Sequence, residues 1–360
     1  MNRLITEMIT PQDVSLLQLV TAARPSREAM DAFLAAWDPV TAEEGRTLLL
    51  ACFLREHPEA GCPAAVQERT RAEFDRCWLR NMRLMTQFKK ISDALGKAGI
   101  GVTVFKGGAM KFLRPALPRP MSDIDVIVAE KDWKRAAAVI RGLGYRYDRD
   151  RHSFDVHQIE SGGGLLDVHR YIPLFSGRER AIMPDLLGRA RKVSVFGADA
   201  SILCAEDLVF TVLVNLTRNL MYKTSSRGIL FAFADIRFLL DSKPDFDWDV
   251  VKDDAERSGS APLLLYAIRF MNGVLPGFLP ETVTVADREM DDLAVRVDYV
   301  RDILCPLQTR SHELGVGKVL KHPRLIPEFL KVRPRYTFLK LFRACPALSR
   351  RILSLRRKGS

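Results

Sequence analysis

Two aspartates separated by one residue stand at the start of an apolar stretch, Ser-Asp-Ile-Asp-Val-Ile-Val over 122–128. Because side chains alternate between the two faces of a strand, a strand over 124–129 would project Asp123 and Asp125 to the same side. Two carboxylates so close repel each other unless a cation neutralises them. Mg²⁺ or Mn²⁺ can do so, together with substrate phosphates. Taken alone, the pair is more typical of a solvated strand end.

A second chemical signal lies just upstream, where Lys106 is followed by Gly107 and Gly108. The β-branched run over 101–106 predicts a strand, and residues 107–113 predict the start of a helix. Glycines at a helix start let backbone N–H groups approach an anion, and the helix dipole favours this. The motif is neither GxxxxGK[ST] nor GxGxxG. By itself it also fits an ordinary tight turn between a strand and a helix.

A third carboxylate, Asp167, lies in Leu-Leu-Asp-Val-His-Arg over 165–170. Residues 153–159 and 165–172, joined by a glycine-rich turn, predict a β-hairpin. If its second strand lies beside 124–129, Asp167 reaches the same site as the two aspartates. His169 shares the face of Asp167, and His157 lies on the partner strand. Each histidine has two interpretations, a catalytic group or a structural hydrogen-bonding residue.

The surrounding pattern predicts an α+β fold, a small mixed β-sheet core flanked by helical regions. Apolar residues at three- and four-residue steps indicate helices over 1–98, and the same period returns from Ala205. Between them, strands and helices alternate, with a helix over 131–145 and a short strand over 191–197. The expected divisions are 1–98 N-terminal helical region, 99–200 α/β core, 201–316 C-terminal helical region and 317–360 basic tail.

Composition is that of an ordinary soluble protein, with 47% apolar and 28% charged residues among 360. No apolar run reaches the length of a transmembrane helix, and the first residues lack the apolar stretch of a signal peptide. A cytoplasmic protein is therefore expected. The six cysteines are scattered without zinc-ligand or CxxC spacing and are interpreted as reduced thiols.

The net charge of +11 is concentrated at one end of the chain. Residues 318–360 carry 13 Lys and Arg against one acidic residue, Glu328, whereas the remainder has a balance of −1. Whole-chain charge thus gives no argument for nucleic-acid binding. The tail alternates apolar clusters with Arg and Lys, which suits contact with an acidic membrane surface or an acidic partner. A solvated basic end fits equally well.

Together these motifs resemble the DNA polymerase β-like nucleotidyltransferase superfamily, and more narrowly its family of uncharacterised nucleotidyltransferases. The resemblance covers residues 100–110, 119–128, 142–145, 157–159 and 166–170, and continues through 233–240 and 245–251. Two departures accompany it. The spacer of fourteen residues between Gly108 and Asp123 lacks a tyrosine that is often present, and Asn215 and Asn219 stand where relatives tend to carry histidines.

The resemblance implies that Asp123, Asp125 and Asp167 are the catalytic, metal-binding carboxylates, with Mg²⁺ or Mn²⁺ as cofactor. A further set is implied to bind the nucleotide, with ATP the expected NTP: Lys106, Gly107, Gly108 and Arg119. Asp235 has either a structural or a functional role. The implied reaction transfers an NMP to an unidentified protein, RNA or small-molecule acceptor and releases pyrophosphate. The alternative is a non-catalytic nucleotide-binding or regulatory module on the same fold.

Overall fold

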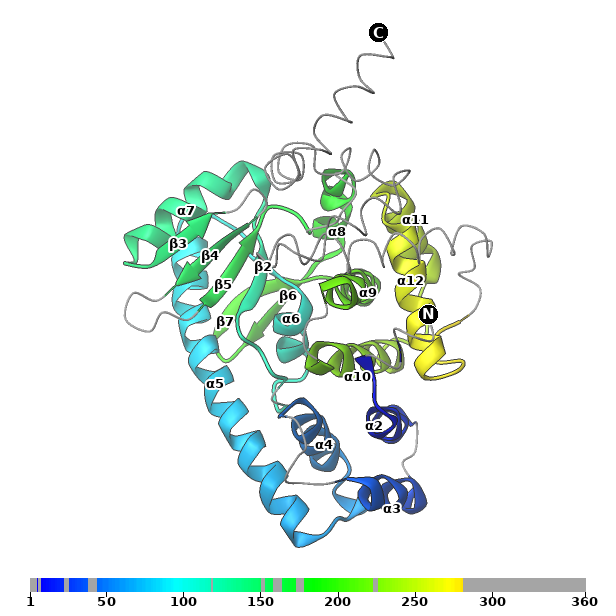
Figure 1. Cartoon of the computed structure of the whole chain (residues 1–360). Coiled ribbons are helices and arrows are strands. Elements are labelled where there is room, and N and C mark those ends of the chain that lie inside the picture. The colour runs from blue at the N-terminus through cyan, green and yellow to red at the C-terminus, as the bar shows by residue number, and fades with distance from the viewer. Residues whose placement is uncertain are drawn as a thin grey trace, which may run out of the picture.

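A computed structural model describes residues 5, 8–22, 26–37, 44–117, 119–149, 153–157, 164–172, 178–222 and 226–280. The predicted basic tail over 317–360 lies outside these residues. The described chain forms a mixed β-sheet with helices before and after it in sequence, so the predicted α+β class is confirmed (Figure 1). No helix in the described ranges is long and apolar enough to cross a membrane.

The sheet has seven strands in the order β3-β4-β5-β2-β1-β7-β6. Its centre is the parallel pair β2 and β5, and β1 joins β2 in antiparallel orientation and β7 in parallel. The remaining pairs, β3 with β4, β4 with β5 and β6 with β7, are antiparallel. The strands span Thr103–Val104 (β1), Ile124–Ile127 (β2), Arg146–Arg149 (β3), Ser153–His157 (β4), Gly164–His169 (β5), Arg191–Val195 (β6) and Ala198–Ile202 (β7).

The strands of the structure differ from the sequence prediction in three places. The expected strand over 101–106 is reduced to the two residues of β1, because Lys106 already begins a helix. The strand expected over 191–197 is present as β6, but the sequence analysis missed β7, which pairs with β6 after Phe196 and Gly197 turn the chain with positive φ. The sequence analysis missed β3, since its residues lack the β-branched composition that marks a strand.

One helix packed on the sheet connects it to the N-terminal helices. The 34 residues of α5 (Ala64–Lys97) pack against β5, β7 and α7 (Trp133–Gly142), and also against α4 (Glu44–Glu56). Figure 1 shows α5 running from the sheet down to α4 and α3. The remaining N-terminal elements are α2 (Pro11–Thr21), α3 (Arg27–Ala36) and the 3-10 helix η1 (Pro58–Ala60). A buried stripe that includes Phe88, Ile91 and Leu95 explains the periodicity of α5.

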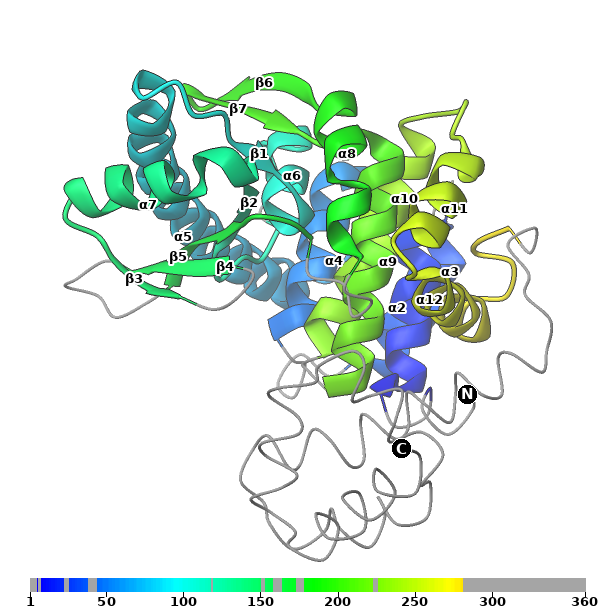
Figure 2. The ribbon, with the colours of Figure 1, turned by 90° about the horizontal axis from the view of Figure 1, so that it is seen from above.

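The C-terminal helices lie beside the sheet rather than in a separate layer above it. Figures 1 and 2 show α9 (Ala205–Tyr222) and α10 (Ser226–Asp241) between the sheet and the helices α2, α11 (Trp248–Arg257) and α12 (Ala261–Val274). Helix α10 packs on α9, α4 and α2, so it joins the two helical regions. The shorter connecting elements are η2 (Glu130–Asp132), η3 (Glu179–Ala181) and α8 (Met183–Arg189).

The helix that follows β1 lies unusually close to the sheet. A Cβ atom at Gly108, in α6 (Lys106–Leu113), would meet Val104 Cγ1 at 2.7 Å and Ile124 Cγ2 at 2.9 Å. No side chain fits there without movement of these buried strand residues. Gly108 therefore sets the approach of α6 to β1 and β2, and with it the position of the first turn of α6.

Candidate functional site

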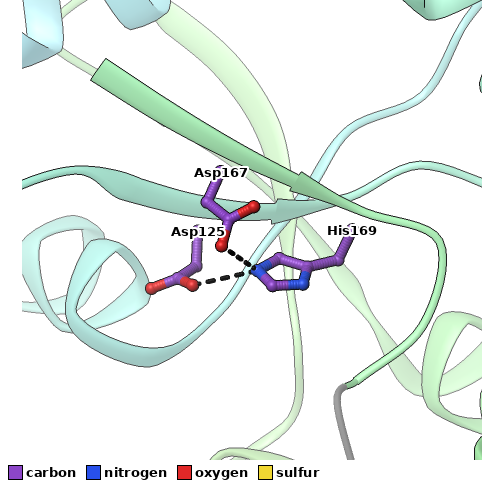
Figure 3. Close-up of side chains that lie close together, drawn as sticks. All are labelled: Asp125, Asp167 and His169. Atoms are coloured by element: carbon purple, nitrogen blue, oxygen red, sulfur yellow. Dashed lines mark hydrogen bonds and ion pairs between the residues drawn. The ribbon is translucent and has the colours of Figure 1, made fainter. Parts of the chain in front are cut away.

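The parallel pairing of β2 and β5 puts two aspartates directly side by side. Asp125 and Asp167 are register partners, and both side chains are only partly buried. The imidazole of His169 lies next to them, with Nε2 at 3.1 Å from Asp125 Oδ1 and 3.0 Å from Asp167 Oδ2 (Figure 3). These three side chains come from two adjacent strands, although Asp125 and His169 are 44 residues apart.

Lys106 supplies a second cation to this group from the first position of α6. Its Nζ lies 2.5 Å from Asp125 Oδ1 and 4.9 Å from the centre of the Phe105 ring. The backbone of Lys106 has φ +50°, a left-handed conformation that is uncommon for a residue with a side chain. Such strain persists only where the surrounding structure enforces it, and it is frequent at functional sites. Here it accompanies the sharp turn from β1 into α6.

Burial and charge act on these groups in opposite directions. Burial would raise the pKa of Asp125, but the Lys106 ammonium and the hydrogen bond from His169 outweigh it and hold that pKa well below its ordinary value. Burial would lower the pKa of His169, yet its hydrogen bonds to Asp125 and Asp167 raise it. Asp125 is therefore ionised at neutral pH, and the charged form of His169 is favoured.

Asp123 stands one residue before β2 rather than on it. Burial, and next the neighbouring Asp125 carboxylate, raise the pKa of Asp123 to about 6. Ser122 Oγ donates a hydrogen bond of 3.2 Å to Asp123 Oδ1. Asp123 is thus electrostatically part of the site but carries its charge less readily than Asp125. A bound cation would favour its ionised form.

Among the described residues, one group offers ligand atoms within 4.8 Å of one another: Asp125, Asp167 and His169. Two atoms of this group, Asp167 Oδ1 and His169 Nδ1, are buried without a hydrogen-bond partner in the described part of the chain. Buried polar atoms are normally satisfied, so an unpartnered carboxylate oxygen in a cluster of acids offers a ligand atom for a cation or a substrate group. Carboxylate oxygens are ligands that suit Mg²⁺ and Mn²⁺. The residues fit a divalent cation.

The two glycines of the predicted phosphate turn have different surroundings. Gly108 is required by packing against the sheet, as described above. Gly107 faces Arg119, whose Nη1 would lie 3.1 Å from a Cβ at this position. A small cavity of about 20 Å³ separates this turn from α9, and its lining includes Lys106, Gly107, Arg119, Asn215 and Asn219. The space beside the first turn of α6 is therefore lined by hydrogen-bond donors together with apolar residues of α9 and α10.

Arg119 is held rigidly beside the turn. Its Nε and Nη2 donate to Asp235 Oδ2 at 3.0 and 2.9 Å, and Nη1 donates to the carbonyl of Pro120 at 2.9 Å. Asn81 of α5 donates a 2.8 Å hydrogen bond to the Arg119 carbonyl. Asp235 is nearly fully buried and does not contact the other acidic residues of the site through any described hydrogen bond or ion pair. Its observed contact orients Arg119.

The structure brings together most of the side chains that the sequence singled out. Lys106, Asp125, Asp167 and His169 are in contact, with Asp123 adjacent and Arg119 beside Gly107. The side chain of His157 lies outside the described part of the structure. Sequence reasoning did not foresee that Lys106 would pair with Asp125, or that His169 would lie between the two carboxylates. The alternation of Asp167 and His169 along one strand was the signal for the second contact.

Residues 39–276, more than half of the chain, match the model of a family described as "Uncharacterised nucleotidyltransferase". The chain belongs to this nucleotidyltransferase family, which confirms the resemblance recognised in the motifs. No curated protein matches the sequence.

Three solved structures show distant similarity. The solution structure of the antibiotic-resistance factor ANT(2'')-Ia is 14% identical with a TM-score of 0.37, over 53% of this chain and 98% of that one. A crystal structure of ANT(2'')-Ia in complex with adenylyl-2''-tobramycin is 14% identical with a TM-score of 0.36, over 50% of this chain and 98% of that one. The crystal structure of an antigenic nucleotidyltransferase-like protein from Paracoccidioides brasiliensis is 11% identical with a TM-score of 0.35, over 60% of this chain and 92% of that one.

Proposed function

We propose that this protein is a metal-dependent nucleotidyltransferase that moves an NMP from an NTP, with ATP expected, to an acceptor and releases pyrophosphate. The observation that carries the proposal is the side-by-side register of Asp125 and Asp167, with Lys106 at the start of α6 against the same carboxylate. Three acidic side chains around two cations leave room for a further positive charge. An unpartnered Asp167 oxygen supports the same conclusion.

Asp123, Asp125 and Asp167 would hold Mg²⁺ or Mn²⁺. When bound, such an ion supplies charge neutralisation to the phosphates and polarises the phosphoryl oxygen. Lys106 and the Gly107–Gly108 backbone at the start of α6 would bind the triphosphate, and Arg119 would add a guanidinium beside Gly107. Asp235 keeps Arg119 in place, because its Oδ2 accepts hydrogen bonds from Arg119 Nε and Nη2.

In the proposed reaction, Asp167 takes the proton of the acceptor hydroxyl. The acceptor oxygen forms a bond to the α-phosphorus, and the bond from that phosphorus to the bridging oxygen of the β-phosphate breaks. Pyrophosphate leaves with the electron pair. His169 contacts Asp167 Oδ2 through Nε2 and so fixes the orientation of the carboxylate that would take this proton.

The test uses each α-labelled NTP with Mg²⁺ or Mn²⁺ and cell extract as the source of acceptors. Label should move to an acceptor with the wild-type protein and not with Asp123→Ala/Asp125→Ala. Transfer that persists in the double variant would contradict the metal assignment. Saturable ATP binding without transfer under any condition would instead support the non-catalytic nucleotide-binding module.

We also propose that the basic tail holds the protein at an acidic membrane surface, as a cytoplasmic protein with peripheral attachment. The excess of basic over acidic residues in 318–360 supports this, because each Lys or Arg near an anionic surface contributes about 1 kcal/mol. Full-length protein should sediment with vesicles that contain phosphatidylserine, and a variant lacking 318–360 should not. Equal sedimentation of both would exclude this role.

A further inference from the structure

A larger cavity, of about 320 Å³, lies apart from the acidic cluster. It is bounded by α2, α4, α10, the second half of α6 and the loop after it. Asp123, Asp125 and Asp167 do not line it, whereas Arg119 lines both this cavity and the small one beside Gly107. Its volume is at the lower end of the range for ligand pockets, which suits a molecule with a single ring rather than a whole nucleotide.

The apolar part of this cavity comes from both helical regions. Side chains from α4, α6 and α10 contribute a continuous apolar and aromatic lining that includes Leu49, Phe53, Met110, Phe231 and Phe238. Two guanidinium groups lie against these rings, Arg114 at 4.6 Å from the centre of Phe238 and Arg119 at 5.4 Å from that of Phe231. Ligand pockets commonly combine such an apolar body with a few placed polar groups.

The charged groups of the cavity are balanced in number. Arg114 pairs with Glu56, Arg119 with Asp235, and Arg237 with Asp241. A lining with three cations and three carboxylates has no net charge, apart from the neighbouring His57. Such a lining complements a ligand that carries one positive and one negative charge at least as well as a ligand with a net charge.

These pairs differ in how much hydrogen-bonding capacity they leave for a ligand. Arg119 uses Nε, Nη1 and Nη2 within the protein. The described ion pair of Arg114 uses only Nη2, so its Nε and Nη1 can still donate. On the acceptor side, the side chains of Glu56 and Asp241 are 42% and 51% exposed, so their carboxylates can accept further hydrogen bonds.

We propose that this cavity binds a small zwitterionic molecule of the amino-acid type, with an apolar or aromatic side chain. Its carboxylate binds the free donors of Arg114, its ammonium binds Glu56 and Asp241, and its side chain occupies the space between Phe53 and Phe231. An anion without an ammonium group would face the exposed carboxylates of Glu56 and Asp241, and a cation without a carboxylate would face the Arg114 guanidinium. This site does not depend on nucleotidyl transfer.

Three ligands of matched shape test the charge requirement with the full-length protein in isothermal titration calorimetry. L-Phenylalanine has both charges, 3-phenylpropanoate lacks the ammonium, and phenethylamine lacks the carboxylate. We expect L-phenylalanine to bind at least about tenfold more tightly than either, with one site per chain. Equal affinities for all three, or no heat from any of them up to about 10 mM, would overturn the proposal.

Variants locate the binding in this cavity. Ala234→Leu adds volume to the α10 wall and should abolish the heat of L-phenylalanine binding.

Arg114→Gln should weaken the binding of L-phenylalanine and 3-phenylpropanoate about tenfold and leave that of phenethylamine unchanged. Asp241→Asn, at an exposed position that tolerates substitution, should weaken phenethylamine and L-phenylalanine alone. Arg135→Gln is the control, because this exposed arginine of α7 pairs with Asp132 and lies outside the cavity lining. Binding unchanged by both Arg114→Gln and Ala234→Leu would place it elsewhere.

Discussion

Two clusters in this molecule place a pair of buried or half-buried aspartates around a basic side chain, and they are built for different purposes. In the first, Asp125 and Asp167 on adjacent strands lie beside His169, with Lys106 on Asp125. In the second, Arg189 of α8 bridges Asp207 of α9 and Asp254 of α11. Both combine like charges that would repel each other in the absence of a cation.

One oxygen in each cluster, Asp167 Oδ1 or Asp254 Oδ1, has no described partner, but the clusters differ in how many hydrogen bonds the cation donates and in how exposed the carboxylates are. Arg189 donates from Nε and Nη2 to Asp207 and from Nη2 to Asp254, whose side chains are 0% and 1% exposed. The planar guanidinium thus ties three helices together with several fixed hydrogen bonds. Lys106 is a single point charge, and the Asp125 and Asp167 side chains remain 15% and 21% exposed. The carboxylates of the first cluster are therefore accessible to a further ligand, whereas those of the second are buried in a cross-link between helices.

The largest expected effect separates the two clusters by function. Asp167→Asn should lower nucleotidyl transfer on the order of 10³-fold, equivalent to about 4 kcal/mol of transition-state stabilisation. The free energy of unfolding should change little, since Asp167 Oδ1 has no described partner to lose and an amide oxygen can replace Oδ2 as the acceptor for His169 Nε2. Label transfer and urea unfolding measure the two quantities. The control, Asp249→Asn, alters a carboxylate that is 87% exposed and should affect neither. A large loss of stability in Asp167→Asn would make the first cluster structural too.

Breaking the second cluster should have the opposite outcome. Asp207→Ala removes the hydrogen bonds between Arg189 and Asp207 and leaves Arg189 paired with Asp254 alone. The loss of one member of a buried pair costs about 3–5 kcal/mol. Urea unfolding should show this loss, while transfer activity per folded molecule stays near wild type. Unchanged stability would mean that the cross-link between α8, α9 and α11 contributes nothing to the fold.

A smaller effect tests how the first cluster depends on backbone packing. Gly108→Ala should destabilise the protein by about 1–3 kcal/mol, because its Cβ would clash with Val104 and Ile124. Gly96→Ala is the matched control in α5, where nothing lies within 4 Å of a Cβ, and it should stabilise by about 0.4–1 kcal/mol. Thermal unfolding of both variants, compared with wild type, measures these changes in stability. If Gly108→Ala is as stable as Gly96→Ala, the sheet accommodates α6 without needing a glycine.

The smallest effect is on the pH dependence of stability. Burial, opposed by Arg189, raises the pKa of Asp254 from 3.8 to about 7. The folded state therefore holds a proton that the unfolded chain releases between these values, so this group's contribution to stability is present below about pH 4 and lost as the pH rises to about 7. Asp254→Asn should remove that part of the slope. The unfolding free energies of wild type and variant are measured at about pH 5 and about pH 8. Relative to wild type, the variant should be more stable at about pH 8 than at about pH 5. A constant difference would show that Asp254 is ionised in the folded protein at both values.

Local patterns were sufficient for much of the fold. The long periodic stripe of α5, the apolar run of β2 and the hairpin of β4 and β5 all lie where their sequences predicted them. Each is decided within a dozen residues by which side chains must be buried. Shorter or less typical elements were missed or misjudged, because β1 has only two residues and β7 follows β6 through a turn with positive φ at Phe196.

The sequence by itself determined which acidic residues could meet: the spacing of Asp123 and Asp125, and the alternation of Asp167 with His169, follow from strand geometry alone. Only the tertiary structure decided which of them touch. The parallel register of β2 with β5 sets Asp125 beside Asp167, and the close approach of α6 brings Lys106 Nζ to Asp125 Oδ1. Arg119 finds Asp235 across 116 residues, and Arg189 joins two helices that are distant in sequence. Such contacts depend on how whole elements pack, and the free energy of that packing is summed over many residues, so no local spacing encodes it.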